Sequence, residues 1–139
     1  MGHVTTDGRR ASLVVLLADD ELVVRSLAQS ILTRAGYRVL NAVDGEHALE
    51  VSRGYSGPID VLLTDVKMPK MDGVELSAHI IKERPGIKVL FMSGKESGEL
   101  MVHGKKMEFL RKPFLAKELS EKISSILGLT ISVYPNWHE

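Results

Sequence analysis

Short apolar runs alternate along this chain with longer segments in which apolar and polar residues are mixed. Unbroken apolar runs of about 4–8 residues, rich in β-branched side chains, are typical of strands buried on both faces of a parallel sheet. Five such runs predict five strands: LVVLLA at 13–18, YRVLNA at 37–42, IDVLLT at 59–64, IKVLFM at 87–92 and MEFLR at 107–111.

The segments between these runs repeat their apolar residues at helical spacing, which predicts amphipathic helices. Gly36 and Gly128 are suitable C-caps, Asp44 is a suitable N-cap, and Pro85 ends the helix before it. The interval 95–106 predicts a short helix of at most two turns, because it holds two glycines and only three apolar residues. The other predicted helices span about 21–35, 45–54, 73–84 and 115–127.

Strand and helix alternate five times, which predicts an α/β domain with a five-stranded parallel sheet and helices on both faces. We expect this doubly wound (βα)5 domain, with a shortened fourth helix, to span residues 12–128. A polar extension at 1–11 precedes it, and a tail at 129–139 follows it. In such sheets ligands bind beyond the carboxyl ends of the strands, where the winding reverses.

The composition excludes several classes of site and partner. Lys+Arg and Asp+Glu are both 18, so the formal net charge is zero and no bulk charge favours nucleic acid or an anionic membrane. The absence of cysteine excludes disulfides and thiolate metal sites. No apolar run is long enough for membrane insertion, and residues 1–12 lack the apolar centre of a signal peptide. We therefore expect a cytoplasmic protein.

Chemically active side chains follow four of the five predicted strands. Asp19 and Asp20 follow the first, Asp65 the third, Ser93 the fourth and Lys112 the fifth. Carboxylates that converge repel one another unless a cation joins them, and an all-oxygen cluster suits Mg²⁺. A lysine and a hydroxyl beside that cation would bind an anion. The strand ends therefore predict a site for phosphoryl chemistry.

Four motifs at these strand ends resemble those of the response-regulator receiver domain, the phosphoacceptor module of two-component signalling. They are VLLADDE at 15–21, LLTDVKMPKMDG at 62–73, FMSG at 91–94 and FLRKPF at 109–114. The resemblance implies a flavodoxin-like fold of the CheY-like superfamily. The MSG wording is most similar to receiver segments of hybrid sensor kinases.

The resemblance also implies a nucleophile and a metal site. Asp65 is then the phosphoacceptor and a Mg²⁺ ligand, which takes a phosphoryl group from a phosphohistidine. Asp20 binds Mg²⁺ directly, the backbone carbonyl of Lys67 is a further ligand, and Asp19 contributes indirectly. For Glu21 we favour a structural role as an acid in the first turn of the following helix.

The remaining implied roles concern the bound phosphoryl group and the signal. Lys112 is expected to reach the phosphoryl oxygens, and the Lys112–Pro113 peptide bond is expected to be cis. Ser93 is expected to hydrogen-bond the phosphoryl group once it is present. Phe109 occupies the position of the aromatic residue whose inward rotation carries the signal, and Ser93 and Phe109 together form the switch.

The implied function is that of a phosphorelay receiver whose partner is a sensor histidine kinase or a histidine phosphotransfer protein. A homodimer is a further possible assembly. The protein is not expected to be an enzyme with a separate substrate, since it promotes only its own phosphorylation and dephosphorylation.

Other functions stay open beside this one. The first is a protein-interaction module of the same fold that acts without phosphorylation. A Mg²⁺-dependent phosphatase is disfavoured, because Lys67 stands where such enzymes usually carry a second carboxylate. DNA binding is weaker still, since a solvated face is the ordinary interpretation of the basic residues near 103–112.

Two departures from the family affect its output and its phosphoryl lifetime. The interval from Ser93 to Lys112 is 19 residues (112 − 93), a few fewer than usual, and the loss falls on the fourth helix. The usual output surface is therefore in doubt. Lys67 and Lys95 stand two residues after Asp65 and Ser93, at positions that tune hydrolysis in this family.

We predict a long-lived phosphoaspartate, because a lysine at either position can pair with phosphoryl oxygens or obstruct the attacking water. Lys67→Ala and Lys95→Ala are therefore expected to shorten the lifetime of the label, followed by intact mass after removal of the phosphodonor. Rapid loss of label from the wild type, unchanged in both variants, would contradict the hypothesis.

Overall fold

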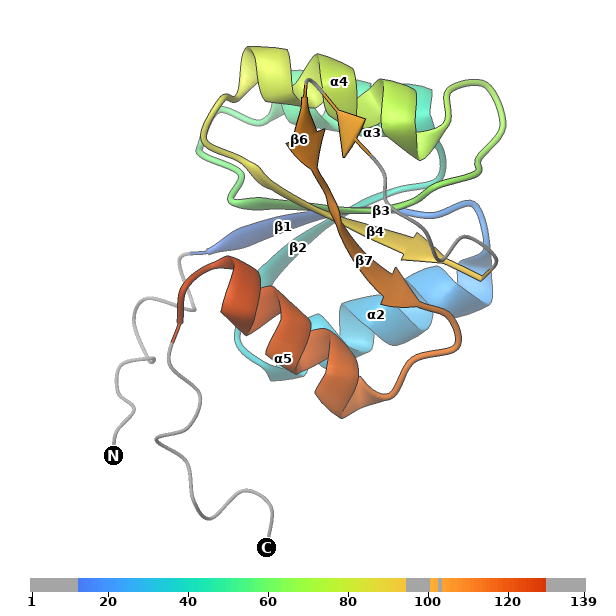
Figure 1. Cartoon of the computed structure of the whole chain (residues 1–139), viewed down its shortest axis with the longest axis vertical. Coiled ribbons are helices and arrows are strands. Elements are labelled where there is room, and N and C mark those ends of the chain that lie inside the picture. The colour runs from blue at the N-terminus through green and yellow to red at the C-terminus, as the bar shows by residue number, and fades with distance from the viewer. Residues whose placement is uncertain (1–12, 95–100, 103, 130–139) are drawn as a thin grey trace, which may run out of the picture.

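The computed structural model describes residues 13–94, 101–102 and 104–129. Five parallel strands form its main sheet in the order β2-β1-β3-β4-β7, as the centre of Figure 1 shows. The prediction of a five-stranded parallel α/β domain is therefore confirmed. The strands are β1 (Val14–Ala18), β2 (Arg38–Ala42), β3 (Val61–Asp65), β4 (Lys88–Ser93) and β7 (Glu108–Arg111).

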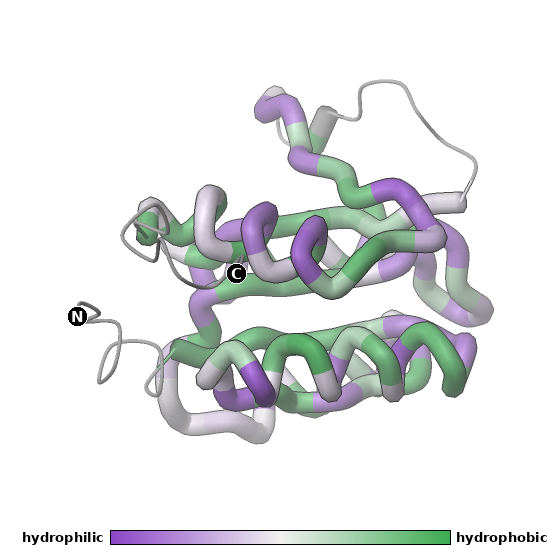
Figure 2. The backbone as a smooth tube through the Cα atoms, turned by 90° about the horizontal axis from the view of Figure 1, so that it is seen from below, coloured by the Kyte–Doolittle hydropathy of each residue, from purple (hydrophilic) through white to green (hydrophobic). Residues whose placement is uncertain are grey.

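Two helices cover each face of this sheet. Helices α3 and α4 lie on one face, and α2 and α5 lie on the other (Figure 1). Figure 2, which views the molecule from the side of the second pair, shows α2 and α5 side by side. None of the helices in the described part of the chain is long and apolar enough to cross a membrane. The helices are α2 (Leu22–Arg34), α3 (Gly45–Gly54), α4 (Gly73–Glu83) and α5 (Ala116–Ile126).

Both faces of the central strands are apolar because both faces are covered. Along β1, Leu16 belongs to the core cluster beneath α3 and α4, whereas Val15 and Leu17 belong to the cluster beneath α2 and α5. All three side chains are fully buried. Successive side chains of a strand point to opposite faces of the sheet. Because both faces of β1 are buried, every position is apolar and the sequence shows an unbroken apolar run.

A small hairpin occupies part of the segment that was expected to be the fourth helix. Strands β5 (Met101–Val102) and β6 (Lys105–Lys106) pair antiparallel, so the helix prediction is wrong for these residues. Gly104 has a φ of 76°, a conformation that favours a tight turn over a helix. Buried Val102 joins the core cluster of α3 and α4, and β5 contacts α4. Residues 95–100 and 103 of the predicted helix lie outside the described residues.

The order of the strands decides which strand ends are neighbours. Ala18, at the end of β1, is in register with Thr64 near the end of β3. At the other side of the sheet, Ser93 at the end of β4 is in register with Arg111 at the end of β7. The residues that follow these positions therefore gather at one edge, where the winding of the sheet reverses.

The loop after β3 lies close to the sheet because two glycines permit it. Gly73 donates its N–H to the carbonyl of Val66 over 2.8 Å, and a Cβ on Gly73 would collide with the carbonyl oxygen of Asp65. A Cβ on Gly45 would likewise collide with the carbonyl of Met71. The backbone around Asp65 is thus in direct contact with the start of α4.

Gly73→Ala is predicted to destabilise the fold by about 1–3 kcal/mol, the usual cost of forcing an extra methyl group into a packed site. Urea unfolding measures the effect. The matched control is Gly54→Ala, at a helical position where an added Cβ meets no atom within 4 Å. That control is expected to raise stability by about 0.5–1 kcal/mol. Equal midpoints for Gly73→Ala and the wild type would refute the packing argument.

Candidate functional site

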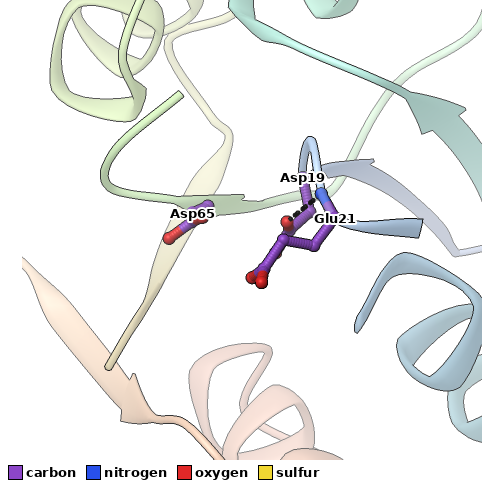
Figure 3. Close-up of side chains that lie close together, drawn as sticks. All are labelled: Asp19, Glu21 and Asp65. Atoms are coloured by element: carbon purple, nitrogen blue, oxygen red, sulfur yellow. Dashed lines mark hydrogen bonds between the residues drawn. The ribbon is translucent and has the colours of Figure 1, made fainter. Parts of the chain in front are cut away.

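One ammonium group and three carboxylates meet at the carboxyl edge of the sheet. Lys112 Nζ lies 3.1 Å from Asp19 Oδ2, 3.1 Å from Glu21 Oε1 and 3.2 Å from Asp65 Oδ2. One carboxylate oxygen of each acid lies within 4.8 Å of the others. Figure 3 shows the three acids, Asp19 and Glu21 from the segment after β1 and Asp65 from β3. The structure therefore brings the predicted nucleophile and the predicted lysine together.

Backbone interactions hold Asp19 rigidly at the end of β1. Its N–H donates to the carbonyl of Ala42 over 3.2 Å, and its own carbonyl accepts a 2.6 Å hydrogen bond from Arg25 Nη1. Its side-chain Oδ1 accepts the N–H of Glu21 over 2.8 Å, the dashed line in Figure 3. Asp19 is fully buried. Its second oxygen is left facing the other charged groups.

Glu21 takes part in the site, which the sequence interpretation missed. Helix α2 begins at Leu22, so Glu21 is its N-cap residue, and its side chain makes no capping hydrogen bond. The expected role as a first-turn helix acid is therefore wrong. Instead its Oε1 accepts a hydrogen bond from Lys112 Nζ. The available signal was its place in the run of three acids that follows an apolar strand.

Asp65 is the last residue of β3 and its side chain is 13% exposed. The hydroxyl of Thr64 donates to the Asp65 carbonyl over 2.9 Å, and the N–H of Val66 donates to the carbonyl of Met92 over 3.1 Å. The first bond is local to β3, and the second attaches the backbone just after Asp65 to β4. The carboxylate is therefore fixed in position while one side of it stays accessible.

Lys112 reaches the carboxylates from the end of β7. Its N–H donates to the carbonyl of Ser93 over 2.9 Å, and its peptide bond to Pro113 is cis, as predicted. Ser93 itself is buried at the end of β4. The pairing of β4 with β7 thus places the predicted hydroxyl and the predicted ammonium at adjacent strand ends, beside the carboxylates.

Asp20, Lys67 and Phe109 lie outside this cluster of charges. Asp20 is exposed and does not belong to the three acids that lie within 4.8 Å of one another. Lys67 is exposed in the loop after β3. Phe109 is partly buried and its ring lies 5.7 Å from the ring of Phe91, centroid to centroid. The metal roles of Asp20 and Lys67 and the rotation of Phe109 stay predictions.

The charges of the site shift the pKa values of its members. Burial raises the pKa of the Asp19 carboxyl. Burial and the nearby charge of Asp19 raise the pKa of Asp65. Burial lowers the pKa of Lys112, but the hydrogen bond to Glu21 and the charge of Asp19 outweigh it, and its pKa rises to about 12. The site is therefore short of positive charge even with the lysine present.

This shortage fits a bound divalent cation. Asp19 Oδ2 is buried and, although it lies 3.1 Å from Lys112 Nζ, it accepts no well-oriented hydrogen bond from any described residue. A buried acceptor without a partner is costly. Hard cations such as Mg²⁺ take carboxylate oxygens as ligands. Asp19 and Asp65 therefore supply buried carboxylate oxygens that suit Mg²⁺, and Glu21 is the third acid within 4.8 Å of them.

Without a cation, the stability of the protein is predicted to fall as pH rises through the elevated pKa values of Asp19 and Asp65. A carboxyl whose pKa is raised on folding favours the protonated state, so its contribution is lost when it ionises. Asp65→Asn removes one of these ionisations. In EDTA near pH 7 this variant is expected to unfold at higher urea concentration than the wild type and to depend less on pH.

The control for this experiment is Asp72→Asn, at an exposed N-cap position where asparagine is also a good cap. It is expected to follow the pH profile of the wild type. If Asp65→Asn and the wild type lost stability in parallel between acid and neutral pH, the electrostatic account of the site would be wrong.

Comparison with known proteins places this geometry in a family. A model of the response regulator receiver domain matches residues 15–124. The sensor kinase CckA of Brucella abortus (strain 2308) is 36% identical over 119 residues, which cover 84% of this chain and 13% of that protein. The response regulator receiver protein CpdR of the same organism is 33% identical over 116 residues, which cover 81% of this chain and 95% of that protein.

The fold of this chain is also similar to that of a solved receiver-domain structure. The crystal structure of the receiver domain from the hybrid histidine kinase CckA has a TM-score of 0.66 and 38% sequence identity, covering 82% of this chain and 98% of that chain. The chain spans about half the length of several transcriptional regulators that it also matches, between 45% and 50%. By its sequence and its fold alike, this chain belongs to the response regulator receiver domain family.

Proposed function

We propose that the protein is a phosphoacceptor in a two-component phosphorelay and that Asp65 carries the phosphoryl group. One observation supports this most directly: the accessible carboxylate of Asp65 lies 3.2 Å from an ammonium that buried Asp19 also contacts. A nucleophile is thereby held beside the positive charge that an incoming phosphoryl group requires.

The proposed reaction transfers a phosphoryl group from a phosphohistidine to Asp65. A carboxylate oxygen of Asp65 forms the new P–O bond while the P–N bond of the donor breaks, and its electron pair returns to the imidazole nitrogen. Lys112 balances charge on the phosphoryl oxygens, and the hydroxyl of Ser93 donates a hydrogen bond to one of them. Asp19 and Asp65 would hold Mg²⁺, which would supply further charge neutralisation when bound.

The donor in this proposal is a sensor histidine kinase or a histidine phosphotransfer protein. Family membership and the relatedness to the receiver of CckA support this class of partner. No separate substrate is turned over, because the phosphoryl group stays on the protein's own Asp65 until water or a relay partner removes it. A cytoplasmic location stays a prediction from the sequence.

The alternative of a phosphorylation-independent interaction module receives less support. Such a module has no need for a buried acid and a lysine at the sheet edge, and burying charges without function is costly. The observed set of Asp19, Asp65 and Lys112, with Ser93 at the adjacent strand end, therefore favours the phosphoacceptor role.

Incubation with a small phosphodonor and Mg²⁺ is predicted to add one phosphoryl group to the wild type, measured by intact mass. Asp65→Asn is expected to gain none, because the nucleophilic carboxylate is absent. EDTA is expected to slow the gain by at least tenfold. Asp72→Asn is the matched control, since it changes an exposed carboxylate outside the cluster, and it is expected to be labelled like the wild type.

Equal labelling of Asp65→Asn and the wild type would assign the phosphoryl group to another residue. If the folded wild type gained no mass from small donors or from a histidine kinase, the phosphorylation-independent module would become the better account.

A further inference from the structure

The contact between Glu21 and Lys112 has a role beyond family membership. We propose that Glu21 is a positioning residue that holds the Lys112 ammonium in the unphosphorylated protein and competes with the phosphoryl group for it. This inference rests on the proposed function, because the competitor is the phosphoryl group on Asp65. The contact itself joins Lys112 Nζ to Glu21 Oε1 over 3.1 Å.

The backbone of Glu21 is fixed although its side chain is exposed. Its N–H donates to Asp19 Oδ1 over 2.8 Å, and its carbonyl accepts the N–H of Arg25 over 3.0 Å, the first turn of α2. These two hydrogen bonds therefore fix the backbone position from which the Glu21 side chain extends toward the site. Figure 3 shows its carboxylate extending to the same side as that of Asp19.

Of the three acids, Glu21 is the one that can release Lys112 at low cost. Its side chain is 60% exposed, whereas the side chains of Asp19 and Asp65 are 0% and 13% exposed. A carboxylate that leaves Lys112 for water is hydrated at once, and an exposed ion pair is weak. Asp19 has no such exit, since moving it would leave a buried charge unpaired.

The charges of the site favour that release when the phosphoryl group arrives. Three carboxylates and one ammonium carry a formal charge of −2 (−3 + 1) before any anion binds. The phosphoryl oxygens add further negative charge beside Glu21 and need the same ammonium. Exchange of the Glu21 carboxylate for phosphoryl oxygens keeps Lys112 paired at every stage, so the lysine needs no large movement.

The alternative role for Glu21 is direct binding of the cation. The two roles predict different effects of neutralising Glu21 on ligand binding. If Glu21 restrains Lys112, its neutralisation strengthens the binding of a phosphoryl analogue and leaves Mg²⁺ affinity nearly unchanged. If Glu21 is a cation ligand, its neutralisation weakens Mg²⁺ binding. The exposed position of Glu21 and its hydrogen bond to Lys112 favour the first role.

The test compares Glu21→Gln with Glu46→Gln, an exposed acid in the first turn of α3 at the same edge of the sheet. Beryllium fluoride, which replaces a phosphoryl group on a carboxylate, is titrated at saturating Mg²⁺ and followed by fluorine NMR. Glu21→Gln is expected to reach half-saturation at about two- to fivefold lower concentration, the range that the loss of an exposed ion pair allows. Glu46→Gln is expected to match the wild type.

Mg²⁺ affinity, measured by calorimetry without the analogue, is the second readout. A change below about twofold in Glu21→Gln supports the proposal, whereas a loss of tenfold or more overturns it and makes Glu21 a cation ligand. Identical beryllium fluoride titrations for Glu21→Gln and Glu46→Gln also overturn it.

A double-mutant cycle separates this inference from the proposed function. Glu21→Gln, Lys112→Met and the double variant are unfolded in urea with EDTA present, so no phosphoryl chemistry is involved. A favourable coupling energy between Glu21 and Lys112 supports the holding role, whatever the result with beryllium fluoride. If the wild type binds neither beryllium fluoride nor a phosphoryl group, the proposed function and the competition fail together, but the holding role does not. No coupling overturns the holding role itself.

Discussion

The Lys112 ammonium is the point on which the carboxyl edge of the sheet depends. It lies 3.1–3.2 Å from acids that come from two separate segments of the chain, and it comes from a third. Carboxylates this close repel one another, and burial raises the pKa of both Asp19 and Asp65. The single ammonium makes their convergence tolerable but leaves Asp19 Oδ2 without a well-oriented donor among the described residues. The site thus carries more negative than positive charge, and a bound cation can offset the difference.

The sheet keeps these charges together because its strand order makes their carrier strands neighbours. β1 lies beside β3, and β4 lies between β3 and β7, so four successive strands end at the site. Apolar packing on both faces gives this arrangement its rigidity. The hydrophobic core therefore positions the strand ends, and the Lys112 ammonium offsets the repulsion among the carboxylates that the core brings together. This agrees with the small or unfavourable net energy that buried ion pairs usually contribute.

The β5–β6 hairpin lies where a fourth helix was expected, and it packs on the side of the sheet that α3 and α4 cover. Val102 of β5 packs in the core cluster that also contacts Phe109, the proposed switch residue. Phe109 in turn lies against Phe91 on the adjacent strand β4. An aromatic movement at this place would therefore act on a hairpin surface.

Most of the fold was predictable because the apolar runs in the sequence correspond to the strands that the core buries. The apolar runs predicted all five parallel strands to within two residues of their observed starts, and Asp44 caps α3 as its position suggested. The hairpin was not predictable from the same signals. The segment holds too few apolar residues to choose between a short helix and a turn, and the burial of Val102 against the core decided between them.

The sequence by itself determined the α/β class and the candidate nucleophile, lysine and hydroxyl, because strand-end positions follow from the apolar runs. Tertiary structure alone decided which of the three consecutive acids contact Lys112. The hydrogen bond from the Glu21 N–H to Asp19 Oδ1 bends the chain so that Asp19 and Glu21 contact Lys112 while Asp20 is exposed. That choice depends on the position of a lysine 91 residues further along the chain, which no local pattern encodes.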